Sequence, residues 1–201
     1  MLTAVTKLLE NPFVFEAQQK FCNNYENVRA EFLDYLSKPG QDILDIGCST
    51  GTCASKVIDM ERQRYTGIDM LPGYVATASR RSSKGRFLTM DGRSLSFGDE
   101  TFDLVIYVGV LHHMDDDTAR ACLSQTHRVL RTNGHVLIAE PVFTRKRWLS
   151  SLLLSMDRGR HIRDEAGYQA LFGKLRTVRE RHFSFSLHRF CSFVLARDEW
   201  R

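Results

Sequence analysis

A ten-residue stretch, Asp42–Gly51, constrains the fold of this chain more than any other. Its first half reads Asp-Ile-Leu-Asp-Ile, a short apolar and β-branched run that predicts a strand buried on both faces. Gly47 and Gly51 then interrupt the pattern, and residues 52–58 resume it at helical spacing. The glycines remove side-chain bulk, and unpaired N–H groups at the start of the helix face the same crevice. The sequence therefore predicts a strand, a turn and a helix that bring a ligand against bare backbone.

The acid Asp45 and the spacing of the glycines narrow the class of ligand. A carboxylate inside the turn repels a pyrophosphate and attracts a cationic amine. Gly47 and Gly51 lie four residues apart, so the Gly-x-Gly-x-x-Gly spacing of dinucleotide-binding turns is not met. A second buried strand, residues 64–69, ends in Asp69, which lies 24 residues after Asp45. A carboxylate at such a strand tip accepts hydrogen bonds from both hydroxyls of a ribose, which indicates an adenosine-containing ligand, NAD among them.

This combination resembles the first motif of the class I S-adenosylmethionine-dependent methyltransferases, (D/E)-x-G-x-G-x-G. The segment Asp45–Gly51 matches it at the acid and at the first and last glycines, whereas Ser49 replaces the middle one. Two later segments share the resemblance: Val-Leu-His-His at 110–113, and the pattern L-R-x-x-G-x-x-L-I-x-E-P, which ends at Pro141. No segment resembles the (N/D)-P-P-(Y/F) motif with which nucleic-acid amino-methyltransferases grip a flipped base.

The resemblance implies an α/β, Rossmann-like fold with helices on both faces of a seven-stranded, mostly parallel sheet of order 3-2-1-4-5-7-6. We expect strands at 43–46, 64–69, 86–90, 102–108, 135–141, 175–185 and 188–197, the last two forming an antiparallel hairpin. Helices are expected within 1–37 and at 52–58, 72–83, 115–131, 148–154 and 164–172. At 201 residues the chain suits a single domain. Its expected parts are an N-terminal helical cap (1–38), a cofactor-binding core (40–141), and an acceptor cap with the C-terminal hairpin (142–201).

The resemblance also implies S-adenosylmethionine as the cofactor, with S-adenosylhomocysteine as the product. Asp45 faces the methionine amine, Tyr25 or Arg29 the methionine carboxylate, Met70 the adenine face, and Asp91 the adenine amine. Alternatively, Tyr25 and Arg29 are ordinary core and surface residues, and Asp91 is an ordinary turn residue. The full set of expected cofactor-binding residues is Tyr25, Asp45, Gly47, Cys48, Ser49, Gly51, Asp69, Met70, Asp91, Gly92 and Val108.

His112, His113 and Glu140 are the candidate catalytic residues. They follow the fourth and fifth predicted strands, and ligands of open α/β sheets bind outside the carboxyl ends of the strands. Histidine titrates near neutral pH, which suits a general base. The resemblance to sugar and natural-product O-methyltransferases implies that a histidine pair and a carboxylate flank the acceptor hydroxyl, with His113 ahead of His112 as the base. Alternatively, one histidine packs under the cofactor and Glu140 only ends a strand; His182 and His188 are expected at the surface of an edge strand.

The charge of the chain is uneven. Its net charge is +4, and residues 142–201 hold 13 Lys/Arg against 6 Asp/Glu. Arg158, Arg160 and Arg163, beside the apolar segment 148–154, suggest an acceptor with a phosphate or carboxylate and a greasy part, or simply a solvated basic face.

The rest of the composition bears on disulfides, on metal ligands and on the cellular compartment of the protein. Five cysteines, an odd number, predict no disulfide framework, and no C-x-x-C or H-x-x-x-H pair gives metal-ligand spacing, so no metal is expected. Residues 1–20 lack the pattern of a secretory signal, and no apolar run is long enough to span a bilayer. A cytoplasmic setting is therefore expected.

These patterns together predict an S-adenosylmethionine-dependent methyltransferase that acts on a small molecule. The expected acceptor is a hydroxyl of a sugar, lipid-linked or natural-product substrate, anionic or amphiphilic if the arginines contact it. Three alternatives stay open: an RNA methyltransferase that uses the basic C-terminal part, an NAD-dependent oxidoreductase, and a non-catalytic S-adenosylmethionine-binding protein, which Ser49 favours. DNA is not an expected partner, and RNA is less favoured than a small molecule.

Overall fold

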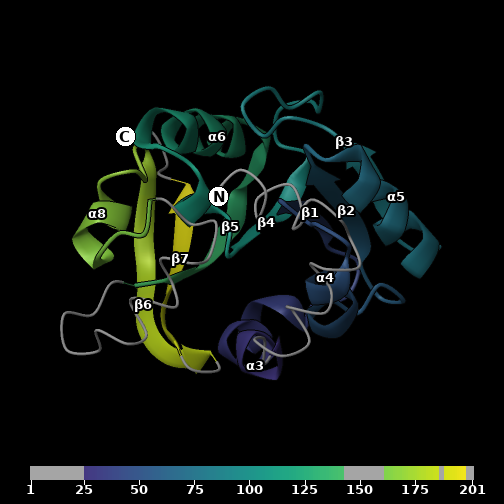
Figure 1. Cartoon of the computed structure of the whole chain (residues 1–201), viewed down its shortest axis with the longest axis horizontal. Coiled ribbons are helices and arrows are strands. Elements are labelled where there is room, and N and C mark those ends of the chain that lie inside the picture. Colours follow the sequence, from purple (N-terminus) through teal and green to yellow (C-terminus); the bar gives the residue numbers. More distant parts are fainter. Residues whose placement is uncertain (1–24, 143–160, 186–187, 198–201) are drawn as a thin grey trace, which may run out of the picture.

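The computed structural model describes residues 25–142, 161–185 and 188–197 (Figure 1). Some features predicted from the sequence lie outside these residues. They are the helical region before Tyr25, the helix over 148–154, and the two arginines Arg158 and Arg160. The helices within them are α3 (Tyr25–Leu36), α4 (Thr52–Val57), α5 (Pro72–Arg81), the 3-10 turn η1 (Leu111–His113), α6 (Asp116–Val129) and α8 (Glu165–Gln169).

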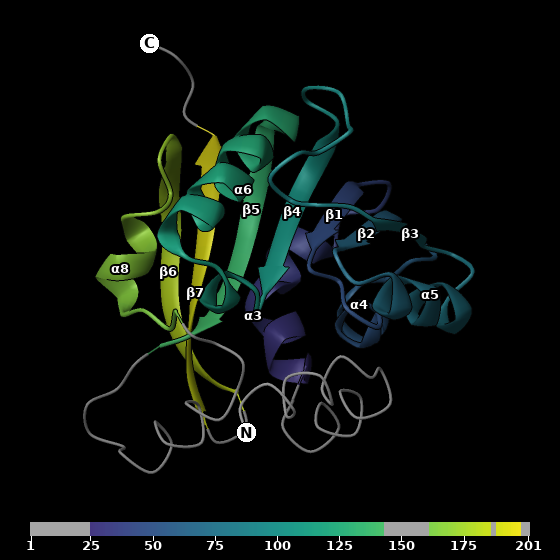
Figure 2. The same cartoon turned by 45° about the horizontal axis from the view of Figure 1, so that its top comes forward.

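Seven strands form one sheet whose order is β3-β2-β1-β4-β5-β7-β6, as predicted. The first five strands pair in parallel, and β7 runs antiparallel to both of its neighbours (Figure 2). Their bounds are β1 (Asp42–Ile46), β2 (Arg64–Asp69), β3 (Arg86–Thr89), β4 (Phe102–Val108), β5 (Leu130–Pro141), β6 (Leu175–Phe185) and β7 (His188–Arg197).

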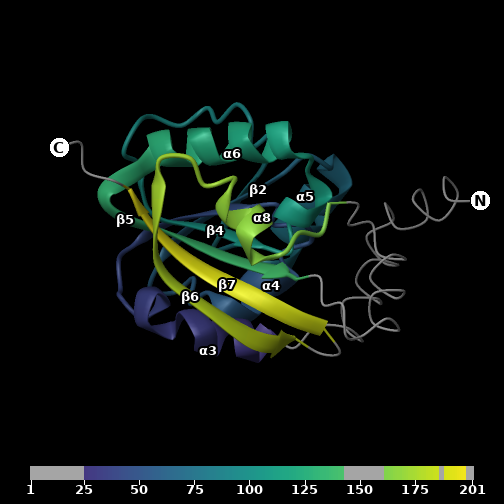
Figure 3. The same cartoon turned by 90° about the vertical axis from the view of Figure 1, so that its left-hand side faces the viewer.

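Helices cover both faces of the sheet, which confirms the predicted architecture; α6 lies on one side and α3 on the other (Figure 3). Side chains of the central strands alternate between the two layers. Leu104 and Ile106 of β4 pack in the core that contains α3 and α4. Val105 and Tyr107 pack in the core that contains α6 and α8. This burial on both faces explains why four consecutive residues of β4, Leu104 to Tyr107, are all aliphatic or aromatic.

Helix α6 begins at a residue that caps it, and strand pairing decides where it ends. The Asp115 side chain accepts a hydrogen bond from the Thr118 N–H at 2.8 Å and so caps the helix. The helix ends at Val129, two residues before its predicted end, because Leu130 already belongs to β5 and pairs with Phe102. The segment that connects β4 to α6 is η1, and it carries both candidate histidines. Within the described part of the chain, no helix has the length and apolar content needed to cross a bilayer.

Candidate active site

The glycine turn lies at the carboxyl end of β1, between β2 and β4. Gly47, Ser49 and Gly51 all adopt left-handed backbone conformations, with φ of 75°, 51° and 74°. A Cβ on Gly47 would lie 2.7 Å from a methyl carbon of Val110, so this residue has no room for a side chain. Ser49 takes the same conformation at a cost of roughly 1–2 kcal/mol. The backbone therefore needs the two matched glycines, and Ser49 is strained.

Asp69, at the end of β2, is tied to this turn. Its Oδ2 accepts the Ser49 N–H at 3.0 Å, and its Oδ1 accepts the Leu71 N–H at 2.9 Å. Burial raises the pKa of Asp69, and these hydrogen bonds oppose the rise. A carboxylate has about four acceptor positions, so Asp69 retains capacity for ribose hydroxyls. The Ser49 Oγ is buried without a hydrogen-bond partner in the described residues, which fits a turn that receives a polar ligand.

Asp45 lies beneath the turn and is only 6% exposed. Its Oδ2 accepts a hydrogen bond from the Tyr65 hydroxyl at 2.7 Å. Burial raises the pKa of Asp45 to about 7, and the negative charge of Asp69 adds to the rise while the Tyr65 hydrogen bond opposes it. Tyr25, the first residue of α3, is buried as well, and its pKa is raised by burial first and then by the nearby Cys53 and Asp45. The structure thus brings Tyr25 and Asp45 into one electrostatic environment.

The other predicted cofactor residues surround the carboxyl ends of β1 to β4. Cys48 is buried in the turn, Val108 ends β4, and Gly92 follows β3. Met70, one residue past β2, is 60% exposed. Arg29, the alternative to Tyr25, lies on the exposed side of α3.

Asp91 has a partner that the sequence analysis missed. The Arg93 side chain binds its carboxylate through Nε at 2.9 Å and Nη2 at 2.6 Å, and the Arg93 N–H binds it at 2.9 Å. These hydrogen bonds, the side-chain ones foremost, hold the pKa of Asp91 below its usual value. Both carboxylate oxygens are therefore engaged before any adenine amine reaches them.

Glu140 is fully buried near the end of β5 and organises the turn that carries the histidines. Its Oε1 accepts the N–H groups of Val110 and Leu111 at 2.8 and 2.7 Å. Its Oε2 lies 2.7 Å from His112 Nδ1 and accepts the His112 N–H at 3.4 Å. Because both oxygens are used in this way, Glu140 fixes η1 against β5.

The two histidines of η1 differ in exposure. His112 is 4% exposed, whereas His113 is exposed. Their ring centroids lie 4.0 Å apart. The 2.7 Å contact between His112 Nδ1 and Glu140 Oε2 sets the orientation of the His112 ring. His113 is consequently the histidine of the pair that a molecule from solvent can reach.

The third arginine of the predicted basic cluster, Arg163, holds the same turn. Its Nη1 donates to the Leu111 carbonyl at 3.0 Å, its Nη2 to the Met114 carbonyl at 2.8 Å, and its Nε and Nη2 to Asp116 Oδ1 at 3.0 and 2.7 Å. Its side chain is only 10% exposed. Arg163 is therefore engaged within the protein, and no local sequence signal identified this role.

Of the two histidines of the last hairpin, His182 has its partner outside the η1 pair. His182 lies on β6, where its Nε2 is 2.6 Å from Glu165 Oε1. His188 begins β7, and its side chain lies outside the description.

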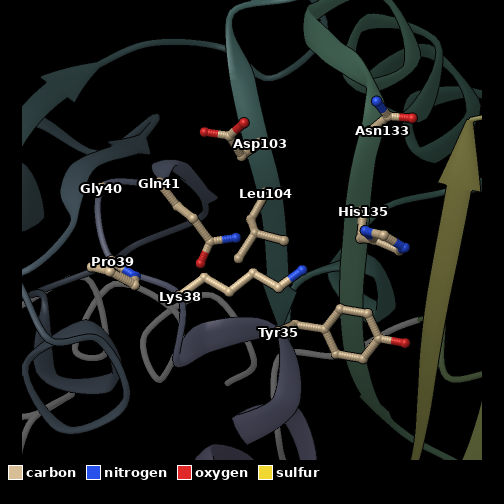
Figure 4. Close-up of a pocket in the computed structure, with 9 residues that line it drawn as sticks. All are labelled: Tyr35, Lys38, Pro39, Gly40, Gln41, Asp103, Leu104, Asn133 and His135. Carbon is tan, nitrogen blue, oxygen red and sulfur yellow. The ribbon is translucent and has the colours of Figure 1, made fainter.

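A cavity of about 310 Å³ lies at the amino ends of β1, β4 and β5, the opposite edge of the sheet (Figure 4). None of the predicted site residues lines it. Its lining residues are Tyr35, Lys38, Pro39, Gly40, Gln41, Asp103, Leu104, Asn133 and His135.

Comparisons with known proteins bear on the family and the fold of this chain. Residues 43–134 match the family described as "Methyltransferase domain". The chain is 32% identical over 136 residues to "Probable tRNA methyltransferase 9B" of Homo sapiens, which covers 60% of this chain and 29% of that protein. It is also 32% identical over 124 residues to an "O-methyltransferase" of Pyrenophora dematioidea, covering 58% and 46%. The chain thus spans less than half the length of these relatives.

A solved structure with a similar fold is the geranyl diphosphate C-methyltransferase of Streptomyces coelicolor A3(2), with a TM-score of 0.71, 12% identity, and coverage of 86% of this chain and 76% of that one. The matched residues 43–134 hold the glycine turn, Asp69 and both η1 histidines. The match over residues 43–134 agrees with the methyltransferase family expected from the sequence, and the likeness to the solved structure confirms the predicted fold.

Proposed function

We propose that this chain binds S-adenosylmethionine at the carboxyl ends of β1 and β2 and transfers its methyl group to a hydroxyl of a small molecule. The cofactor supplies a methyl group on a positively charged sulfur, which leaves as a neutral thioether and needs no acid. The chain's own residues have to align the acceptor oxygen with the methyl carbon and remove the hydroxyl proton.

The residues around the glycine turn suit the cofactor part of this proposal. The buried Asp45 carboxylate pairs with the methionine ammonium, and Tyr25 contacts the methionine carboxylate. Gly47, Cys48, Ser49 and Gly51 line the turn, and the unpartnered Ser49 hydroxyl gains a hydrogen bond there.

The residues that follow β2, β3 and β4 suit the nucleoside. Asp69 accepts from the ribose hydroxyls, Met70 packs on the adenine face, and Gly92 and Val108 border the same edge. Asp91 accepts from the adenine amine at an acceptor position that Arg93, which contacts both carboxylate oxygens, leaves open.

His113 is proposed as the general base, and the Glu140 hydrogen bonds are the observation that carries this assignment. They hold His112 buried and leave His113 exposed beside it, at the edge where the cofactor would bind. Glu140 and His112 are then positioning residues, since neither is exposed enough to touch an acceptor. A base is needed most for a hydroxyl, because an amine only has to be neutral to attack.

RNA is the second candidate acceptor. The similarity to a protein named as a probable tRNA methyltransferase favours it, as does the basic C-terminal part of the chain. The similarity to a protein named as an O-methyltransferase, and the exposed histidine beside a buried carboxylate, favour the small-molecule hydroxyl.

Methyl-labelled cofactor tests the proposal directly. The purified chain is incubated with simple sugars, phenolic compounds, polyprenyl-linked sugars and total tRNA in parallel. We expect label in a small molecule, and we expect His113→Ala to lower kcat by about 10²–10⁴-fold while S-adenosylhomocysteine binds as before. His135→Ala, at the opposite edge of the sheet, is the matched control and should stay active. Label in tRNA alone, or full activity of His113→Ala, would overturn it.

A further inference from the structure

Three side chains of types that bind metals meet on the C-terminal hairpin, and none of them belongs to η1 or to the glycine turn. In the antiparallel pairing of β6 with β7, His182 lies directly opposite Cys191. Glu180 lies two residues before His182 and so on the same face of the sheet. One donor atom from each of Glu180, His182 and Cys191 lies within 4.8 Å of the other two. Cys191 is fully buried, while Glu180 and His182 lie at the surface.

Helix α8 orients two of these three side chains. It lies beside β6 in both views (Figures 1 and 2). Glu165 Oε1 is 2.6 Å from His182 Nε2, and Gln169 Nε2 donates to Glu180 Oε2 at 2.5 Å. Glu165 and Gln169 are four residues apart and therefore share one face of the helix. One helical face thus supports both surface members of the cluster.

The contact between His182 and Glu165 is the kind that accompanies a metal ligand. A histidine that binds a metal through one ring nitrogen usually donates the N–H of the other to a carboxylate, which fixes the ring. Here Nε2 faces Glu165, so Nδ1 is the nitrogen left for a metal. Glu165 then supports the site from outside, as Gln169 does for Glu180.

We propose that Glu180, His182 and Cys191 bind a divalent transition-metal ion, with Zn²⁺ the best match. Thiolate, imidazole and carboxylate are the three ligand types that Zn²⁺ accepts together, whereas Mg²⁺ and Ca²⁺ take oxygen ligands. Water completes a tetrahedral set, because two of the ligands reach solvent. The Cys191 thiol proton is released to solvent as the sulfur–metal bond forms. The ion ties α8 and both strands of the hairpin together.

Cobalt substitution tests this proposal. Protein without a histidine tag is stripped with a chelator and titrated with Co²⁺. We expect a near-ultraviolet thiolate-to-cobalt absorption band at one equivalent, its displacement by Zn²⁺, and a rise in Tm on adding Zn²⁺. Cys191→Ser should lose the band, and Glu165→Gln should weaken Zn²⁺ binding by about 10–100-fold.

The matched control is Cys122→Ser, which removes another buried thiol on α6 and should keep the band. The proposal is overturned if wild-type protein gives no band, or if Cys191→Ser keeps it. Should Cys191→Ser fail to fold, His182→Gln decides, because that side chain is 34% exposed and its loss is readily tolerated. Unchanged Zn²⁺ affinity in His182→Gln would then reject the site.

Discussion

At the scale of single residues, Asp45 carries a carboxyl group whose charge a bound ligand can change. Burial raises its pKa to about 7, so near neutral pH the free protein holds both the protonated and the ionised form. A bound ammonium stabilises only the ionised form. We therefore expect the affinity for S-adenosylhomocysteine to increase as the pH rises through about 7, with up to one proton released on binding. Calorimetry in buffers of different ionisation enthalpy measures that proton.

Asp45→Asn is the control for this pH dependence. The amide keeps an acceptor for the Tyr65 hydroxyl and removes the charge. Binding of S-adenosylhomocysteine should weaken and lose its dependence on pH around neutrality. A heat of binding that is the same in every buffer for the wild-type protein would show that Asp45 does not respond to the ligand.

The same carboxyl makes a separate prediction for the free protein. Its folded pKa is raised, so its stabilising contribution is present in full below the unfolded pKa of about 4 and is lost as the pH rises through about 7. Asp45→Asn should accordingly unfold at a higher urea concentration than the wild type at pH about 8, with a smaller difference at pH about 5. An equal difference at both pH values would contradict the assignment of the shift to Asp45.

Ser49 is expected to lower the stability of the fold and to strengthen cofactor binding. Ser49→Gly relieves the left-handed backbone and removes a buried hydroxyl without a partner, and the added flexibility of the unfolded chain offsets part of the gain. We expect a net gain of about 1 kcal/mol, which raises Tm by about 2–4 °C. Affinity for S-adenosylhomocysteine should fall if the hydroxyl binds the cofactor. Unchanged or tighter binding would remove Ser49 from the cofactor site.

At the scale of elements, η1 is held by partners from both sides. Glu140 of β5 binds its N–H groups, and Arg163 binds the carbonyls of Leu111 and Met114. Arg163→Gln should cost about 2 kcal/mol of unfolding free energy, because charged hydrogen bonds to the turn are lost. We also expect kcat to fall about tenfold, since His113 loses its fixed position. Urea unfolding and the labelled-methyl assay measure the two effects.

Arg120→Gln is the matched control for this arginine. Arg120 pairs with Asp116 and Asp117 on the surface of α6, and its side chain is 48% exposed. Exposed pairs of this kind contribute little, so stability and kcat should stay near the wild-type values. Equal losses in both variants would mean that Arg163 acts through general stability rather than through η1.

Elements with a local apolar pattern and the order of the strands were predictable from the sequence, whereas the side-chain contacts between elements were not. The bounds of β4, β6 and β7 matched, because each strand is an apolar or alternating run between clear breaks. The hydrogen bonds from Arg163 to the Leu111 and Met114 carbonyls join residues about fifty positions apart, and no local sequence pattern predicts such contacts. The opposition of His182 and Cys191 depends on strand register, so a search for ligand spacing along the chain missed it.

At the scale of the whole molecule, the site is a consequence of topology. Parallel strands end on one edge of the sheet, so the glycine turn, Asp69 and η1 meet there although they are far apart in the sequence. The strand order therefore brings the glycine turn, Asp69 and η1 to this edge, while their roles in binding and catalysis stay predictions. The sequence did not predict which side chains hydrogen-bond to one another there, because those partners depend on side-chain geometry. The hydrogen bond from Arg93 to Asp91 is an example.

The thermal stability of the folded protein shows which of two adenosine-containing ligands, S-adenosylhomocysteine or NAD, binds to it. A ligand at one hundred times its Kd stabilises the folded state by about 2.7 kcal/mol. For a domain of this size S-adenosylhomocysteine should then raise Tm by about 5–11 °C, while NAD should leave it unchanged because Asp45 repels a pyrophosphate. Asp69→Asn should reduce the shift, and Asp117→Asn, a fully exposed acid on α6, should not. An equal shift with NAD would place a dinucleotide at the turn and remove the basis for methyl transfer.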